Sequence, residues 1–308
     1  MTAYGIRIES DFSLWADLPD QAEFFRTVTL RKESPLFPKN SFSQKVLSYA
    51  RLHGRKIVFS RMYAAEKAYM PGEPLVYEVE NVVRFSWWHG SDEIWIQTLR
   101  DCTDERLAFW VLHPFLPFFL TVENSLVLLH GSSIQIGREA LLLLAPFDGG
   151  KSTLVNKALS REVWLVSDDV VPIAVEGKEA VCIPSHPYIH LDRKAESLGT
   201  RSRNYADRFL PLKAICLLSW NRKNDNIFFE EIRGVRRFVI LKEHGVYTSL
   251  LTHQDSLDLA IGTLGNQLPF FNLTRPFGMK YLDQTVEDIL SYFGSRFEAE
   301  NSINHNLP

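Results

Sequence analysis

Short apolar runs and turns alternate through the N-terminal third of the chain. The runs are rich in β-branched and aromatic residues, which favour strands, and turn pairs such as Pro71-Gly72 separate them. No long helical pattern intervenes, so the sequence predicts an antiparallel, β-rich module over residues 1–124. The expected strands are Tyr4–Ile8, Lys56–Phe59, Leu75–Val79, Val82–Trp87 and Ile94–Thr98.

The pattern changes at Thr103, where Thr103-Asp104-Glu105-Arg106 has the composition of a helix N-cap and first turn. The apolar run Leu107–Leu129 follows and is interrupted by Pro114 and Pro117. Its unbroken part is too short to span a bilayer. We therefore expect a buried helix followed by a strand, and no membrane segment.

From Ser125 onward, fully apolar strands are separated by helical stretches, a pattern typical of α/β layers. This predicts an α/β domain over residues 125–294, and the polar residues 295–308 predict a flexible tail. The expected elements are the strands Ser125–Leu129, Ile134–Ile136, Ala140–Leu144, Val163–Val166 and Ala214–Trp220 and the helices Lys151–Leu159 and Thr285–Phe293.

A buried leucine strand runs directly into the segment Ala145-Pro-Phe-Asp-Gly-Gly-Lys-Ser-Thr153. Glycines allow backbone N–H groups to converge on phosphate oxygens, and the start of a helix adds free N–H groups and the positive end of its dipole. We predict a phosphate-binding loop made by Gly149, Gly150, Lys151, Ser152 and Thr153, in which the lysine reaches the β and γ phosphates and the Ser152 hydroxyl binds Mg²⁺.

Two residues depart from the usual phosphate-loop pattern. Ala145 stands where the first glycine is usual, and Asp148 brings a carboxylate next to the expected triphosphate. The Asp148 side chain can point outward, reach the metal, or weaken the affinity for nucleotide, and the sequence does not choose among these.

Two carboxylates, Asp168 and Asp169, end the next apolar strand. Open α/β sheets collect ligands at the carboxyl ends of their strands. One of the two acids can hold Mg²⁺ and the other can take the proton of an attacking hydroxyl, whereas the alternative is a solvated Asp-Asp turn.

Three segments, His130-Gly131-Ser132, Ala145–Thr153 and Val166-Ser167-Asp168-Asp169, occur in the order and at the approximate spacing of a known family. Over residues 126–215 the chain resembles the catalytic domain of HPr kinase/phosphorylase and its smaller kinase-like relatives, some of which phosphorylate a serine of a precursor peptide. The resemblance implies a P-loop kinase domain that uses ATP and Mg²⁺. It also implies that Lys151 and Ser152 hold phosphates and metal and that Asp168 is the general base. Asp169 would then pair with His130 and contribute to the metal site.

Composition excludes little beyond these points. The chain has 308 residues, 45% of them hydrophobic, and its net charge of −3 gives no argument for nucleic-acid binding. Its three cysteines are far apart and have no metal-ligand spacing, as in a protein of the reducing cytosol. Because the N-terminus also lacks the pattern of a secretory signal, we expect a cytoplasmic protein.

The leading hypothesis is an ATP-Mg²⁺-dependent kinase that transfers the γ-phosphate to a Ser/Thr-type hydroxyl of a peptide, a protein or a small molecule. The alternative is a nucleotide-binding switch or scaffold that helps a partner enzyme without transferring phosphate. The sequence leaves open whether the protein forms a homo-oligomer. The basic stretch between Pro184 and Pro211 is a further candidate for contact with the transferring phosphoryl group or an acidic peptide; it contains Arg193, Lys194, Arg201, Arg203 and Arg208.

Overall fold

The structure is a computed structural model that describes residues 1–14, 16–32, 45–61, 70–123, 126–146, 149–177, 179–189, 194–221, 225–247 and 254–304. The chain forms two compact units. Unit 1 comprises Met1–Ser125 with the short segments Arg193–Leu198 and Tyr247–Leu257. Unit 2 comprises Leu126–Asp192, Gly199–Val246 and Asp258–Pro308. The sequence pattern does not predict that unit 1 also takes the two short segments from the C-terminal half.

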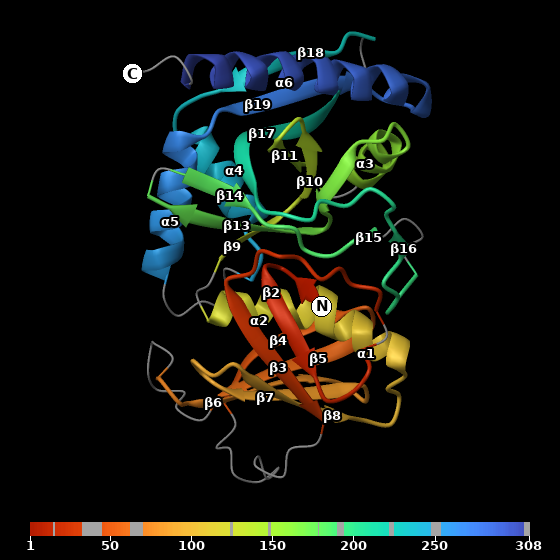
Figure 1. The fold of residues 1–308 in the computed structure, drawn as a ribbon, viewed down its shortest axis with the longest axis vertical. Coiled ribbons are helices and arrows are strands. Elements are labelled where there is room, and N and C mark those ends of the chain that lie inside the picture. The colour runs from red at the N-terminus through yellow and green to blue at the C-terminus, as the bar shows by residue number, and fades with distance from the viewer. Residues whose placement is uncertain are drawn as a thin grey trace. The chain divides into compact units, whose positions relative to one another are not determined.

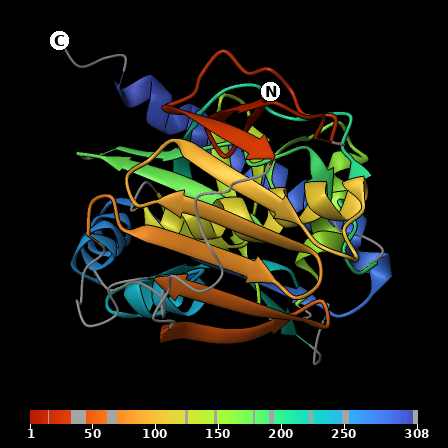
Figure 2. The same ribbon diagram turned by 90° about the horizontal axis from the view of Figure 1, so that it is seen from below.

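Unit 1 is built on one mixed sheet. Among the described residues its strands are β1 (Thr2–Ala3), β2 (Ile6–Ser10), β3 (Arg26–Lys32), β4 (Lys45–Leu52), β5 (Arg55–Arg61), β6 (Pro74–Val79), β7 (Val83–Trp88) and β8 (Glu93–Thr98), in the spatial order β1-β2-β3-β8-β7-β6-β5-β4. The strands β4 to β8 form the predicted antiparallel meander, which Figure 2 shows in orange. The prediction is wrong for β2 and β3, which pair in parallel with each other, as β3 does with β8. A connection longer than a hairpin turn joins β2 to β3, and such a connection permits parallel pairing.

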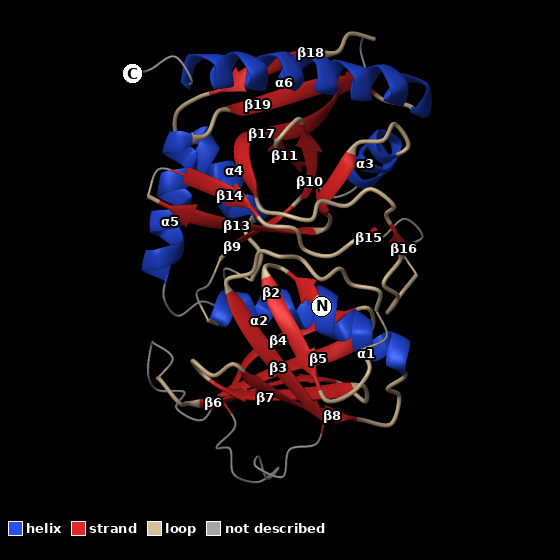
Figure 3. Ribbon diagram, in the orientation of Figure 1, coloured by secondary structure: helices blue, strands red, loops and turns tan. Residues whose placement is uncertain are grey.

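The apolar run after Thr103 forms three consecutive helical segments, α1 (Asp104–Trp110), the π-helical turn η1 (Val111–Phe115) and α2 (Leu116–Val122), seen beside the sheet of unit 1 in Figure 3. Thr103 is the predicted N-cap and accepts a hydrogen bond from the Arg106 backbone N–H. Pro114 has no N–H to donate, and the Leu116 N–H closes the wider turn onto Val111 O. Every residue from 107 to 122 is buried. In the described part of the chain, no helix has both the length and the apolar character needed to cross a membrane.

Aromatic rings fill the interface between these helices and the sheet of unit 1. Phe115 stacks on Phe85 with ring centroids 3.9 Å apart, and Phe118 meets Phe59 edge-on at 4.7 Å. Such contacts stabilise a core beyond the area that they bury. The predicted buried helix is thus confirmed.

Unit 2 contains the longer sheet, with strand order β12-β10-β11-β17-β14-β13-β9; β19 also pairs with β17, and β18 pairs with β19. β11 and β17 are parallel, as are β17 and β19, so their carboxyl ends lie at one edge (Figure 1). The described strands of this unit are β9 (Val127–His130), β10 (Ser132–Ile136), β11 (Glu139–Leu144), β12 (Trp164–Ser167), β13 (Val170–Glu176), β14 (Glu179–Cys182), β15 (Tyr188–Ile189), β16 (Thr200–Arg201), β17 (Leu210–Asn221), β18 (Phe228–Ile232) and β19 (Phe270–Pro276).

The helices that follow are α3 (Lys151–Leu159), α4 (Arg236–His244), α5 (Gln254–Gln267), the 3-10 turn η3 (Met279–Tyr281) and α6 (Leu282–Asn304). α3 has the predicted bounds. The predicted tail is wrong for residues 295–304, because they continue α6. Phe297 extends the buried stripe of Val286, Ile289 and Phe293 at helical spacing, and burying it favours the longer helix.

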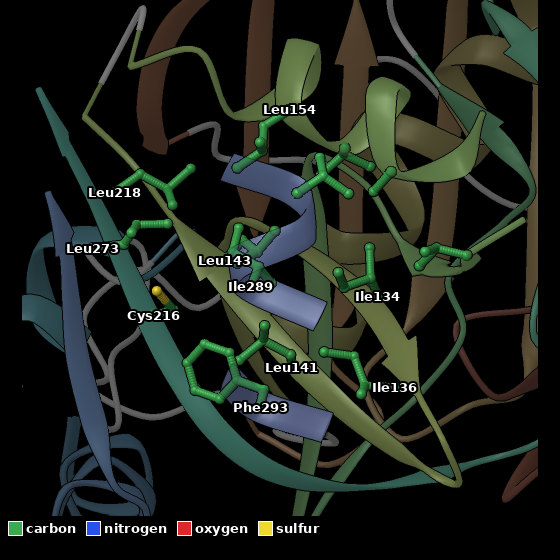
Figure 4. Close-up of a cluster of buried hydrophobic side chains, with 14 of the residues drawn as sticks. Ile134, Ile136, Leu141, Leu143, Leu154, Cys216, Leu218, Leu273, Ile289 and Phe293 are labelled. Atoms are coloured by element: carbon green, nitrogen blue, oxygen red, sulfur yellow. The ribbon is translucent and has the colours of Figure 1, made fainter. Parts of the chain in front are cut away.

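One hydrophobic core holds α3 and α6 against the sheet of unit 2. This core includes Leu154 of α3, Phe293 of α6, Leu141 and Leu143 of β11 and Leu218 of β17, and Figure 4 shows the Phe293 ring next to Leu141. Because this core anchors the first turns of α3, it also fixes the loop that precedes the helix.

Candidate active site

The loop between β11 and α3 ends in Gly150, which is the N-cap of the helix and has φ of +74°. Gly150 has no side chain that could cap the helix, and in an α-helix the first N–H groups, here those of Lys151, Ser152 and Thr153, have no carbonyl partner within the helix. Gly149 donates its N–H to Pro146 O at 2.8 Å and closes a turn. Asp148, whose carboxylate the sequence leaves open, lies outside the described residues.

Close packing explains why positions 149 and 150 are glycine. A Cβ on Gly149 would lie 2.8 Å from the Cβ of Ala145, so the alanine that replaces the usual first glycine touches this turn. A Cβ on Gly150 would lie 2.8 Å from Trp220 Cζ2 and 2.8 Å from Arg275 Nη2. The loop therefore approaches its neighbours more closely than any other residue type would allow.

The two predicted acids and His130 lie where the chain turns twice between strands. β9 ends at His130 and β10 begins at Ser132, while Asp168 and Asp169 link β12 to β13. The two turns are adjacent, because Gly131 donates its N–H to Asp169 O at 3.1 Å. A Cβ on Gly131 would lie 3.0 Å from Leu143 O, so this turn too requires glycine.

Lys151, Ser132 and Asp168 form a buried polar triad. Lys151 Nζ donates to Ser132 Oγ at 3.0 Å, and Ser132 Oγ donates to Asp168 Oδ1. Lys151 Nζ also lies 3.9 Å from Asp168 Oδ1, and the two side chains are only 8% and 3% exposed. Buried charges of opposite sign that share a hydroxyl compensate each other's lost hydration.

His130 and Asp169 form a second, accessible pair beside the triad. His130 Nδ1 lies 3.4 Å from Asp169 Oδ1, and the side chains are 46% and 50% exposed. The carbonyl of His130 accepts a hydrogen bond from His244 Nδ1 at 3.2 Å. Burial lowers the pKa of His244 below its usual value, and the hydrogen bond to His130 opposes this shift.

Arg275 is a site residue that the sequence analysis missed. Its Nη2 donates to the carbonyl oxygens of Gly149, at 3.0 Å, and Gly150, at 3.3 Å, and its guanidinium lies 3.9 Å from the centre of the Trp220 ring. Burial lowers the pKa of Arg275 to about 10, which leaves it charged at neutral pH. The sequence does contain a signal for Arg275. It follows Phe271 and Leu273 at every second position, which places a charged residue on the core face of a strand.

Ser132 was also given no role in the sequence analysis, although it ends the His-Gly-Ser segment. Strand pairing brings it to the site, because Ser132 and Ser133 of β10 lie opposite Leu143 and Leu142 of β11, and Ser133 also faces Ser167 of β12. The signal for Ser132 was the segment itself, but its two charged partners depend on this pairing.

The residues predicted to bind Mg²⁺ offer oxygen donors, which this ion prefers. Ser152 and Asp169, the two predicted ligands, supply one hydroxyl and one half-exposed carboxylate. In the described part of the chain, no cluster of three His, Cys, Asp or Glu side chains has metal-binding geometry. Mg²⁺ bound with a nucleotide uses one or two carboxylates and takes its other oxygens from phosphates and water, so the donor set suits that ion.

Arg208 and Lys194 of the predicted basic stretch lie close to acidic side chains. Arg208 lies 3.6 Å from Asp207, and Lys194, which belongs to unit 1, lies 3.8 Å from Glu105. Arg201 and Arg203 are exposed, and Arg193 lies outside the described residues. A contact between any of these side chains and a substrate stays a prediction.

No protein-family model and no curated protein matches the chain. Among solved structures, the chain is similar to the Hpr(Ser) kinase/phosphatase from Coxiella burnetii, with 14% sequence identity and a TM-score of 0.36. The match covers 56% of this chain and 98% of that one. A likeness this distant assigns no function to the chain. The function has to be argued from the chemistry of the chain's own side chains.

Proposed function

We propose that unit 2 binds the triphosphate of ATP, together with Mg²⁺, at the N-terminus of α3 and transfers the γ-phosphoryl group to a hydroxyl. The observation that carries this proposal is the buried lysine that begins α3 and lies 3.9 Å from a buried carboxylate. Lys151 supplies positive charge where the helix dipole and the free N–H groups of the first turn already favour an anion.

The glycine loop adds to this anion site. Arg275 holds the carbonyl oxygens of Gly149 and Gly150. In a planar peptide group the C=O and the following N–H point in opposite directions, so the N–H groups of Gly150 and Lys151 face away from the guanidinium. Phosphate oxygens at the helix N-terminus would accept hydrogen bonds from these groups.

Transfer requires a group that takes the proton of the acceptor, and we assign that role to Asp168. The acceptor oxygen forms a bond to the γ-phosphorus while the bond from phosphorus to ADP breaks, and the hydroxyl proton passes to the Asp168 carboxylate. Ser132 donates a hydrogen bond to Oδ1 of this carboxylate, and Lys151 Nζ lies 3.9 Å from the same oxygen. We therefore assign the incoming proton to Oδ2.

The accessible pair supports the same reaction. Asp169 and Ser152 would hold Mg²⁺, which neutralises phosphate charge when bound. His130, whose Nδ1 lies 3.4 Å from Asp169 Oδ1, would orient this carboxylate. The acceptor that fits this chemistry is a Ser/Thr-type hydroxyl of a peptide, a protein or a small molecule, including a precursor peptide.

A nucleotide-binding switch without transfer is the second candidate. It is favoured by the triad itself, since Ser132 occupies the space between Lys151 and Asp168 and satisfies both charges. If the acid stays bound to this serine when ATP is present, the nucleotide is held but not consumed.

The test combines ATP binding with mass spectrometry of candidate acceptors incubated with ATP and Mg²⁺. Lys151→Ala should abolish ATP binding and transfer, while Asp168→Asn should abolish transfer and largely spare binding. The matched control is Lys157→Ala, which removes a lysine of the same helix that pairs with Asp283 at 2.9 Å. Full transfer by Asp168→Asn would remove the general-base assignment. ATP binding without transfer to any acceptor would favour the switch, and the absence of ATP binding in the wild type would refute both functions.

A further inference from the structure

The strand order of unit 2 gives the glycine loop two different flanks. On one flank, Ser132 begins β10 and Asp168 directly follows β12. On the other, β17 and β19 run parallel to β11 and end at the same edge. A nucleotide whose γ-phosphate points toward Asp168 therefore extends its other end toward β17 and β19.

β17 continues beyond β11 along this second flank. The last paired residues are Leu144 and Leu217, and Trp220 follows three residues later, about 10 Å further at the rise of a strand. This places the Trp220 ring beside the loop, where a Cβ on Gly150 would touch it. Arg275 lies 3.9 Å from the centre of the same ring, so the ring is fixed from two sides.

An exposed aromatic ring lies next to Trp220. Phe277 follows β19 directly, and its ring centroid is 5.1 Å from that of Trp220 at an interplanar angle of 67°. The side chain of Phe277 is 59% exposed, and Met279 two residues later is 72% exposed. Large apolar side chains gathered beside a polar site are typical of ligand contacts, whereas isolated ones are common on any surface.

The turn that presents Phe277 is held at both ends. The Phe277 N–H donates to Asn221 O at 3.3 Å, and the Tyr281 N–H donates to Gly278 O at 3.3 Å. The Tyr281 hydroxyl also donates to Asp225. A ring on an anchored turn loses little conformational freedom when a flat ligand stacks on it.

We infer that Phe277, supported by Trp220, is the platform on which the base of the nucleotide stacks. The inference rests on the proposed phosphate site and assigns the other end of the same ligand. Aromatic rings stack on nucleobases through their π-faces, and the contact of Trp220 with Gly150 joins the platform to the phosphate loop.

The experiment compares the dissociation constants of ATP and inorganic tripolyphosphate, each with Mg²⁺, by isothermal titration calorimetry on the full chain. Tripolyphosphate carries the phosphates without the base. Phe277→Ala should weaken ATP binding about 5- to 160-fold, the range that base stacking supplies, and should leave tripolyphosphate binding unchanged. Phe277→Tyr keeps the ring and should bind ATP like the wild type. Phe228→Ala removes another exposed phenylalanine of unit 2 and should change neither constant.

Three other outcomes refute the platform alone, and a fourth refutes the proposed function as well. If Phe277→Ala leaves ATP binding unchanged, or if the wild type binds tripolyphosphate as tightly as ATP, the platform is refuted while the phosphate site stands. An equal loss for both ligands in Phe277→Ala also refutes it, because the ring would then act on the phosphate loop. If the wild type binds neither ligand, the proposed function and the platform are refuted together.

Discussion

Replacing Ser132 with alanine removes one hydroxyl and two hydrogen bonds to charged groups. Lys151 donates to this oxygen at 3.0 Å, and the hydroxyl donates to Asp168. Hydrogen bonds to charged groups contribute roughly 1.5–3 kcal/mol each, so their sum is about 3–6 kcal/mol. The lysine and the carboxylate, 3.9 Å apart, can recover part of this by approaching each other. We expect Ser132→Ala to lower the free energy of unfolding by about 2–4 kcal/mol.

Ser133→Ala is the matched control, because it makes the same change at the next residue of β10. Both serines are fully buried. Among the described residues, the Ser133 hydroxyl accepts a hydrogen bond from the Cys182 thiol at 3.2 Å, and a thiol is a weak donor. Its loss should cost less than about 1 kcal/mol.

Guanidinium denaturation of the two variants and the wild type, followed by circular dichroism, gives the free energy of unfolding of each protein. The two losses of stability can be compared directly if the dependence on denaturant (the m-value) is the same in all three proteins. The reasoning fails if Ser132→Ala loses no more stability than Ser133→Ala, since the two charges would then not depend on the shared hydroxyl.

Three further predictions concern the loop, the site histidine and the core of unit 1. Gly150→Ala should lower the melting temperature more than Gly137→Ala, because both glycines have positive φ but only at Gly150 would the Cβ collide with Trp220; equal shifts would contradict the close approach. The folded-state pKa of His244 is lowered by burial, so the unfolded chain binds more protons between that pKa and about 6.5, and stability is lost as pH falls through this window. Denaturation midpoints at pH 7.5 and 5.5 should therefore differ more for the wild type than for His244→Gln, and an equal difference would argue against the shift. Phe115→Ala should cost about 3–5 kcal/mol in chemical denaturation, and a cost below about 1 kcal/mol would mean that the stacked ring is not part of the core.

Local sequence was sufficient where the physical cause is local. The leucines of β11, the glycines and the helical residues after Lys151 predict a strand, a tight turn and a helix, and α3 has the predicted bounds. The N-cap of α1 is likewise correct, because Thr103 bonds to a backbone group only three residues away. Such contacts can be inferred without knowledge of the rest of the fold.

Where partners are distant in sequence, the sequence pattern was insufficient. The parallel pairing of β2 with β3 and the length of α6 depend on which surfaces are available for burial. Arg275 meets the glycine loop only because β19 pairs with β17 and β17 with β11. No local propensity encodes that approach.

The sequence by itself determined the candidate residues Lys151, Ser152, Asp168 and Asp169, since glycine-lysine-serine after an apolar strand and paired acids after the next one follow from local chemistry. His130 was a candidate through the family resemblance. Only the tertiary structure decided that Ser132 lies between Lys151 and Asp168, and that the aromatic rings lie on the opposite flank of the loop. The physical reason is that strand order and register bring together groups more than a hundred residues apart, such as the guanidinium of Arg275 and the backbone carbonyl of Gly149. Pairing of this kind depends on the packing of the whole sheet.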